Sequence, residues 1–185
     1  MNHESLALPY TICFCMSQGK VLLLYRYRPP HQYRWNGVGG KIEQGETPRE
    51  AIAREVREEA AMDLAMAEGV RFAGIVTWSG LVGSPNNNKG MYAFIADFSK
   101  AEARWEEREI DEGRLGWKEI SWSLDASNPA VAENIPHFLP RMIEGRELLE
   151  YHCVYEGGEF KEVIIRPLPD FVSAKGMLSA SSKIL

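Results

Sequence analysis

The alternation of apolar and polar positions predicts strands near the start of the chain. Residues 10–16 and 21–27 are two apolar runs rich in β-branched and aromatic side chains, and such runs favour strands. The four residues between them, 17–20, include a glycine and are few enough to form a tight turn. We therefore expect the chain to begin with a β-hairpin.

A helical pattern follows a glycine-rich loop. From Pro48 to about Met62 no internal glycine or proline occurs, and alanine, glutamate and arginine dominate, which favours a helix. Thr47 is suited to cap this helix, and Glu50 would complete a capping box. Proline is common in the first turn of a helix, so the start at Pro48 fits the same interpretation.

Later apolar runs predict further strands at 70–78, 91–98 and 115–120, and the segment 83–90 is rich in turn-forming residues. A final pair of runs, 151–156 and 159–166, flanks two adjacent glycines and predicts a second hairpin. These runs add five strands to the two at the start of the chain.

Residues 129–149 predict another helix, interrupted by Pro136 and Pro140. This order of elements does not follow regular β-α-β alternation, so we expect an α/β (α+β) fold with a mixed sheet and helices on its faces. With 185 residues, of which 45% are hydrophobic, the chain is long enough for one domain with a substantial core. We expect that single domain to cover 1–169, followed by a flexible tail at 170–185.

Charge and cysteine content narrow the function classes. The net charge is -5 and the lysines and arginines are scattered, which argues against a long nucleic acid as partner. A signal peptide and a membrane-spanning run are both lacking, so we expect a soluble, cytoplasmic protein without a membrane partner. Cys13, Cys15 and Cys153 are expected to be buried free thiols.

The predicted helix at 48–62 carries three glutamates that point toward metal chemistry. Glu55, Glu58 and Glu59 fall within an arc of roughly 100° beside the apolar stripe of Ile52 and Val56. Like charges this close repel one another, and a hard cation would offset the repulsion. Carboxylate oxygens suit magnesium or manganese. The alternative is a solvated helix face stabilised by ion pairs.

The loop before this helix strengthens the metal interpretation. Four glycines lie between positions 37 and 45, with Lys41 among them. Glycines allow a backbone to bend sharply and to approach a ligand closely. A glycine-rich loop alone is a weak signal, but its fixed spacing to the acidic helix is a specific one.

The loop and the helix together resemble the Nudix box, whose pattern is Gly, five residues, Glu, seven residues, then Arg-Glu-U-x-Glu-Glu-x-Gly-U with U a bulky aliphatic residue. Gly40, Glu46 and the run Arg54-Glu55-Val56-Arg57-Glu58-Glu59 match it. Ala61 stands where the family has glycine. That glycine serves the backbone turn and not the chemistry, so the helix is expected to run slightly further or to end differently here.

This resemblance implies a Nudix-type α/β/α sandwich around a mixed β-sheet and hydrolysis of a nucleoside diphosphate linked to another moiety. It implies an Mg²⁺ ion, with Mn²⁺ as an alternative. The implied metal ligands are the Gly39 carbonyl, Glu55, Glu58 and Glu59. Glu58 or Glu59 would also orient or deprotonate the attacking water, and Gly40 with the Glu46–Arg54 pair would give structural support. A further acid from a later loop is expected at Glu112, with Glu109 behind it and a plain loop carboxylate as the alternative.

The run from Arg34 to Lys41 resembles the MutT-like branch, whose members act as 8-oxo-dGTP diphosphatases. If this chain resembles that branch in its contacts, Asn36 would contact the purine, and Glu133 or Asn134 would form hydrogen bonds with the base edge. Phosphate would meet Arg26, and Lys41 is a further substrate-binding candidate. The alternative for Asn36 is a turn residue, because Asn-Gly pairs are common in turns. For Trp35, Trp78, Trp117 and Trp122, core packing is favoured over base stacking.

Other functions stay open at this level. The same fold acts on ADP-ribose, nucleotide sugars and dinucleoside polyphosphates, and some relatives bind nucleotides without catalysis, although these usually lose box carboxylates. An isoprenyl diphosphate isomerase would need a catalytic cysteine near the site, whereas Cys13 and Cys15 sit on an early strand. The expected partner is a small nucleotide, and a monomer and a homodimer both remain open.

Overall fold

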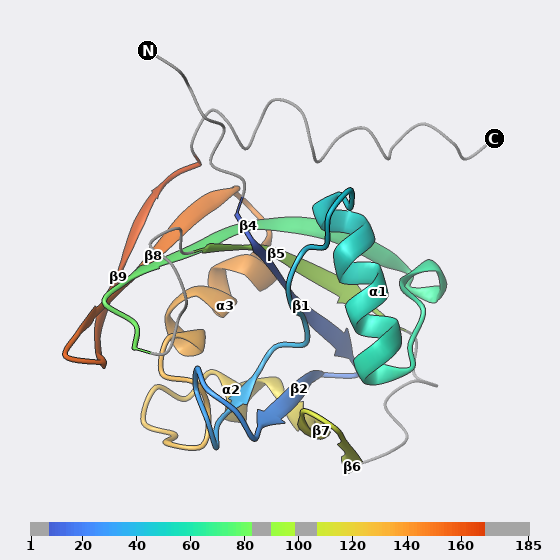
Figure 1. Ribbon diagram of the computed structural model, residues 1–185, viewed down its shortest axis with the longest axis horizontal. Helices are drawn as coiled ribbons and strands as arrows, with labels where there is room; N and C mark the ends of the chain where they lie inside the picture. The colour runs from blue at the N-terminus through green and yellow to red at the C-terminus, as the bar shows by residue number, and fades with distance from the viewer. Residues whose placement is uncertain (1–7, 83–89, 99–106, 169–185) are drawn as a thin grey trace.

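The computed structural model describes residues 8–82, 90–98 and 107–168, which form one mixed sheet with helices on both faces (Figure 1). The strands are β1 (Tyr10–Ser17), β2 (Lys20–Arg26), β3 (Trp35–Asn36), β4 (Gly69–Ser79), β5 (Gly90–Asp97), β6 (Glu107–Ile110), β7 (Gly113–Glu119), β8 (Leu149–Glu156) and β9 (Glu159–Pro167). The helices are α1 (Pro48–Ala60), the 3-10 helix η1 (Leu64–Met66), α2 (Ile120–Ser123) and α3 (Ile135–Glu144).

The strand order is β6-β7-β2-β1-β5-β4-β8-β9, with β3 paired to β2 at the side of this path. Strands β1 and β5 run parallel, as do β4 and β8, and the other pairs are antiparallel. The prediction of a mixed sheet is therefore confirmed.

Alternate residues of β1 pack into two separate cores. Ile12 and Phe14 belong to the core that contains α3, whereas Cys13 and Cys15 belong to the core that contains α1. Successive side chains of a strand point to opposite faces, so the two helices cover opposite faces of the sheet (Figure 1). This arrangement confirms the α/β/α sandwich.

Both predicted hairpins are present. Gln18 and Gly19, with φ of 51° and 77°, form a two-residue turn between β1 and β2. Gly157 and Gly158, with φ of 59° and 85°, do the same between β8 and β9. Positive φ at both central residues suits the twist of a tight hairpin.

Helix α1 begins as predicted and ends slightly earlier. Thr47 and Glu50 form the capping box, with both reciprocal hydrogen bonds present. Ala61 follows the last helical residue in the left-handed conformation, with φ of 53° and ψ of 30°. Its N–H donates to the Arg57 carbonyl at 3.0 Å, and the N–H of Met62 donates to the Val56 carbonyl at 3.5 Å. The chain thus makes the helix-ending turn without the glycine that usually makes it.

The prediction of a helix over 129–149 is wrong at both ends, since α3 covers only 135–144 and β8 begins at 149. Trp35 of β3 donates its N–H to the Ala130 carbonyl at 2.8 Å and accepts from the Ala132 N–H at 2.9 Å. Because residues 130–132 form these backbone hydrogen bonds with β3, they cannot form the first turn of a helix. Pro136 lies in the first turn of α3 and so does not interrupt it, whereas Pro140 lies inside the helix.

The remaining element predictions have mixed outcomes. The strands predicted at 70–78 and 91–98 are confirmed to within a residue, while β7 starts before the predicted 115. The short strand β6 was not predicted, because its four residues are mostly charged. Of the turn-rich segment predicted at 83–90, residues 83–89 lie outside the described residues, and residue 90 begins β5. The tail 170–185 also lies outside them, and the domain boundary at 169 stays a prediction.

Two findings bear on the cysteines and on membranes. All three cysteines are buried and free, as predicted. In the described ranges, every helix is too short or too polar to cross a membrane.

Candidate active site

The glycine-rich loop lies directly on β1. The N–H of Thr11 donates to the Gly40 carbonyl at 2.8 Å, and Cys13 exchanges backbone hydrogen bonds with Val38 at 2.7 and 3.1 Å. A Cβ on Gly39 would lie 2.3 Å from the carbonyl oxygen of Thr11. The loop therefore needs glycine at 39 to approach the strand this closely.

Gly40 lies beneath the side chain of Glu55. A Cβ at position 40 would stand 2.5 Å from Oε1 of Glu55 and 2.7 Å from Oε2, well inside van der Waals contact. Glu55 can therefore occupy this position only because residue 40 has no side chain.

Glu59 is tied to the same loop and is buried. Its Oε2 accepts a 3.0 Å hydrogen bond from the N–H of Gly39, whereas its Oε1 has no hydrogen-bond partner in the described part of the chain. Burial and then the nearby Glu112 carboxylate raise the pKa of Glu59 to about 8. A buried carboxylate with an unpartnered oxygen is suited to hold a cation.

Arg54 connects the loop to the helix through three acidic side chains. It forms a bidentate pair with Glu46, with Nε to Oε1 at 2.8 Å and Nη2 to Oε2 at 3.0 Å. Its Nη2 also donates to the carbonyl of Lys41 at 3.0 Å. Its Nη1 donates to Glu55 at 2.9 Å and to Glu58 at 3.2 Å. Bidentate charge-assisted pairs fix geometry as well as adding stability.

The donor set of the site fits a hard divalent cation. Glu55, Glu58 and Glu59 present only oxygen atoms, which is the ligand type that magnesium and manganese prefer. Within the described ranges these carboxylates do not form a ready group of three metal ligands, since Glu55 and Glu58 turn to Arg54. The unpartnered Oε1 of Glu59 remains available to a cation.

Glu112 lies in the turn between β6 and β7 and faces the box glutamates across the site. Its carbonyl accepts from the N–H of Tyr27 at 3.1 Å, which fixes the turn. Burial is the main cause that raises the pKa of Glu59 and of Glu55, and the nearby Glu112 carboxyl adds to both shifts. Glu109, the residue considered behind it, accepts instead from the hydroxyl of Tyr27 at 2.8 Å. The structure therefore brings Glu112, and not Glu109, to the site.

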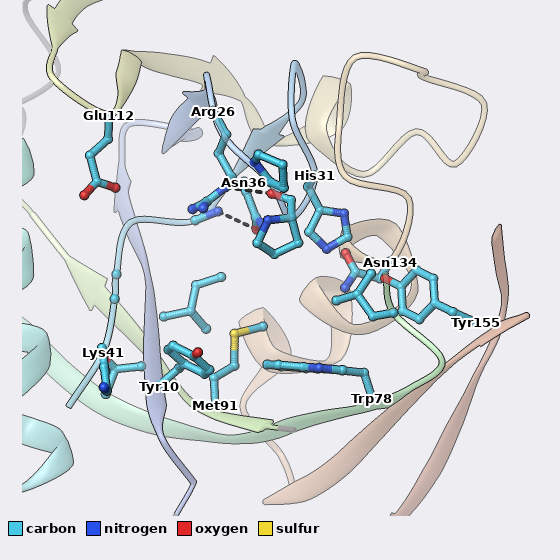
Figure 2. A pocket seen from close by; sticks show the side chains of 18 residues that line it. Tyr10, Arg26, His31, Asn36, Lys41, Trp78, Met91, Glu112, Asn134 and Tyr155 are labelled. Atoms are coloured by element: carbon cyan, nitrogen blue, oxygen red, sulfur yellow. Dashed lines mark hydrogen bonds between the residues drawn. The ribbon is translucent and has the colours of Figure 1, made fainter. Parts of the chain in front are cut away.

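A cavity of about 350 Å³ extends from Glu112 and the glycine loop (Figure 2). Four of the five predicted substrate-binding residues line it: Arg26, Asn36, Lys41 and Asn134. Sequence reasoning missed further wall residues, among them Tyr10, His31, Leu81, Met91 and Tyr155, and favoured core packing for Trp78, which also lines the cavity. They come from β1, the loop after β2, β4 and the segment after it, β5 and β8, so no local pattern connects them.

Two of the lining side chains also hold their own loops. The Oδ1 of Asn36 accepts from the N–H of Gly37 at 2.8 Å, which is the turn role considered as the alternative. The Nε of Arg26 donates to the Pro30 carbonyl at 2.9 Å. Figure 2 shows both bonds at the upper wall of the cavity.

Of the two candidates for reading the base, only Asn134 reaches the cavity. Its side chain is 4% exposed, and its Oδ1 has no hydrogen-bond partner among the described residues. Glu133 does not line the cavity and instead accepts from Nη1 of Arg34 at 2.5 Å, with Nδ1 of His31 at 3.7 Å. Burial would raise the pKa of Glu133, but His31 and Arg34 lower it to about 2. Glu133 is therefore engaged in an ion pair with Arg34 and does not line the cavity.

The tryptophans divide between core and surface. Trp35 and Trp117 are buried, which confirms core packing for them. For Trp122 the prediction is wrong, since this residue of α2 is 37% exposed. Trp78 both packs on the core that contains α3 and lines the cavity, with its ring centroid 6.3 Å from that of Tyr10.

Comparison with known proteins decides the family. A model described as "NUDIX domain" matches residues 8–141, most of the chain. The chain belongs to the Nudix family. Within it, an uncharacterized Nudix hydrolase, YvcI of Bacillus subtilis, is 30% identical over 146 residues, which cover 78% of this chain and 85% of that protein. The protein is thus an enzyme of the Nudix hydrolase class.

Two further relatives are similar over different extents. A putative 8-oxo-dGTP diphosphatase 2 of Mycobacterium tuberculosis is 42% identical over 62 residues, or 32% of this chain and 44% of that protein. The crystal structure of a mutator MutT protein from Bacillus halodurans superposes with a TM-score of 0.61 at 23% identity, covering 86% of this chain and 98% of that one. The latter likeness shows that the Nudix fold extends over nearly the whole described chain.

Proposed function

We propose that this Nudix hydrolase converts an oxidised purine nucleoside triphosphate, such as 8-oxo-dGTP, into the monophosphate and pyrophosphate. One observation carries the proposal: a single cavity reaches from Glu112 and the box loop at Gly39 and Gly40 to an inner end formed by Asn134 and Trp78. A volume of about 350 Å³ lies in the range of small-ligand sites. The printed name of the mycobacterial relative supports the same substrate class.

The box end of the site fits an Mg²⁺ ion, or Mn²⁺ in its place. Glu55, Glu58, Glu59 and the Gly39 carbonyl would hold it, and Arg54 would release Glu58, whose side chain is 61% exposed. When bound, such an ion neutralises charge on a diphosphate and lowers the pKa of a coordinated water. Gly39 and Arg54 keep two of the carboxylates in place beforehand.

The side chains around the diphosphate have separate tasks in the proposed reaction. Lys41 and Arg26, at the cavity wall, bind phosphate oxygens by charge-assisted hydrogen bonds. A carboxylate takes the proton of the attacking water, and Glu112, Glu58 and Glu59 are the candidates for this base. The water oxygen forms a bond to phosphorus as the bond between the α- and β-phosphates breaks, and pyrophosphate leaves.

The inner end of the cavity accommodates the base in this proposal. Asn36 and Asn134 offer polar groups to its edge, and Trp78 offers an aromatic face for stacking. A site built to hydrogen-bond one base edge rejects a base that leaves those groups unpaired. This arrangement would separate purines by the groups on their edges.

The cellular setting is part of the same proposal. We propose a cytoplasmic enzyme that acts on free nucleotides as a monomer or a homodimer. The scattered distribution of 21 lysines and arginines in a chain of net charge -5 supports a small-molecule substrate over a long nucleic acid.

A substrate panel tests the proposed function. With magnesium, the protein should convert 8-oxo-dGTP and dGTP to monophosphate and pyrophosphate faster than it cleaves ADP-ribose, and a chelator should abolish turnover. A preference for ADP-ribose, a nucleotide sugar or a dinucleoside polyphosphate would replace the proposed substrate while keeping the reaction class.

Two glutamine variants test the box chemistry in the same assay. Glu59→Gln should lower kcat by about a hundredfold or more, since it removes a charge from the site. Glu162→Gln, at an exposed position of β9, should leave kcat unchanged. Equal rates for the wild type and Glu59→Gln would contradict the proposed mechanism but not the assignment of the fold.

A further inference from the structure

The β8–β9 hairpin contributes a wall to the cavity from outside the matched family domain. The NUDIX domain match ends at 141, whereas Tyr155 lies near the end of β8 and lines the cavity. Figure 2 shows Tyr155 directed toward Asn134 and His31. Its ring is held by Phe160 of β9 at 5.6 Å and by His31 at 6.3 Å between centroids.

Two buried polar atoms at this end of the cavity have no partner. The hydroxyl of Tyr155, whose side chain is 3% exposed, and the Oδ1 of Asn134, 4% exposed, make no hydrogen bond within the part of the chain that the structure describes. An unpartnered buried polar atom costs about 1–3 kcal/mol, so native proteins rarely keep one without a reason. A ligand that bonds to both atoms would remove this cost.

The two atoms have opposite hydrogen-bonding characters. Burial raises the pKa of Tyr155 far above its usual range, so its hydroxyl stays protonated and has a proton to donate. The amide nitrogen of Asn134 donates to Sγ of Cys153 at 3.8 Å, which leaves Oδ1 as an acceptor turned elsewhere. Tyr155 on β8 thus has a proton to donate, and Asn134 at the start of α3 has an oxygen that can accept.

We propose that Tyr155 determines base specificity: its hydroxyl donates to the 6-carbonyl of a purine while Oδ1 of Asn134 accepts from the adjacent ring N–H. This inference rests on the proposed purine nucleotide function. Guanine, its 8-oxo form and hypoxanthine carry this carbonyl beside an N–H. Adenine carries an amino group beside a bare ring nitrogen. Because the phosphates at the Nudix box fix the sugar end, adenine would place its amino donor against the Tyr155 hydroxyl donor and its ring-nitrogen acceptor against the Asn134 oxygen acceptor.

Nucleotide monophosphates test the inference by binding alone. Wild-type protein should bind dIMP, which has the carbonyl and N–H but no 2-amino group, more tightly than dAMP in calorimetry without metal. Tyr155→Phe should weaken dIMP binding about tenfold and leave dAMP binding unchanged, because a hydrogen bond to a neutral group is lost and the ring remains.

Tyr151→Phe is the matched control. Tyr151 is on the same strand, and its hydroxyl is also buried without a hydrogen-bond partner in the described ranges, but it does not line the cavity. It should bind both nucleotides like the wild type. The melting temperature of each variant separates a loss of binding from a loss of folding.

The outcomes separate this inference from the proposed function. If dIMP binding is unchanged in Tyr155→Phe, or if dIMP and dAMP binding fall together, the specificity role is overturned, whatever the substrate panel shows. If the panel gives no triphosphate turnover but Tyr155→Phe still removes the preference for dIMP, the proposed function fails. The role of Tyr155 in base specificity is then kept. Wild-type protein that binds neither nucleotide and turns over neither triphosphate would overturn both.

Discussion

The backbone N–H of Gly39 donates a 3.0 Å hydrogen bond to the carboxylate of Glu59. This bond joins the loop on β1 to helix α1, two segments twenty residues apart in the chain. It uses one carboxylate oxygen and leaves the other without a partner among the described residues. The orientation of a central acidic side chain therefore depends on how closely the loop approaches the strand, and glycine permits that approach.

Replacing Gly40 by alanine should disrupt the site without unfolding the protein. The new Cβ would lie 2.5 Å from Oε1 of Glu55, so the carboxylate must move. Since a displacement of about 1 Å in a catalytic group can cost a hundredfold in rate, we expect kcat/KM on the best panel substrate to fall at least about tenfold. Gly69→Ala is the control, because its Cβ would meet only Asp97, at 4.0 Å. Unchanged activity in Gly40→Ala would contradict the assigned position of Glu55.

Arg54→Lys should show that the guanidinium fork, and not charge alone, positions the acidic residues. Lysine keeps the charge but has no planar pair of donors to match Glu46 at 2.8 and 3.0 Å. We expect activity and manganese affinity to fall about 10- to 100-fold, as for other residues that orient metal ligands. Both are measured by titrating manganese in the hydrolysis assay. Arg57→Lys, at a 63% exposed side chain, should behave like the wild type.

Metal-free protein should lose stability as the pH rises through neutrality, and Glu59 should be the cause. Its folded pKa of about 8 exceeds the ordinary value near 4.3, so the folded state holds a proton that the unfolded state has released. The stabilisation is complete below about pH 4.3 and declines up to about pH 8, at no more than about 1.4 kcal/mol per pH unit.

Urea unfolding in chelator at several pH values measures this effect. The slope of unfolding free energy against pH between 5 and 8 should be less negative in Glu59→Gln than in the wild type, whereas Glu162→Gln should keep the wild-type slope. Parallel curves for the wild type and Glu59→Gln would show that the carboxyl titrates alike in both states.

Ala61→Gly should stabilise the protein by about 1 kcal/mol. Ala61 has φ of 53° and ψ of 30° after the end of α1, a left-handed conformation that costs an L-residue with a Cβ about 1–2 kcal/mol. Part of that gain is offset because glycine increases the entropy of the unfolded chain. The urea midpoint measures the change. Ala65→Gly, inside the 3-10 helix η1, should shift the midpoint in the opposite direction.

Local sequence determined the parts of this protein that depend on neighbours along the chain. The capping box of Thr47 and Glu50, the two tight turns and the alternating sides of β1 each arise within a few residues. The fixed spacing from Gly40 to Glu59 likewise identified the family before any fold was known. Such features follow from backbone geometry and helical or strand periodicity, which a single sequence carries in full.

Tertiary structure alone decided the substrate end of the site. Asn134 and Glu133 are adjacent and polar. The contact with Cys153 holds Asn134 at the cavity, whereas the ion pair with Arg34 holds Glu133 away from it. Tyr155 reaches the same cavity because β8 pairs in parallel with β4, more than seventy residues earlier in the chain. The helix predicted over 129–149 failed at its start for the same reason, since backbone bonds to Trp35 outweighed local propensity. Long-range contacts are set by the free energy of the whole fold, and a local pattern does not contain them.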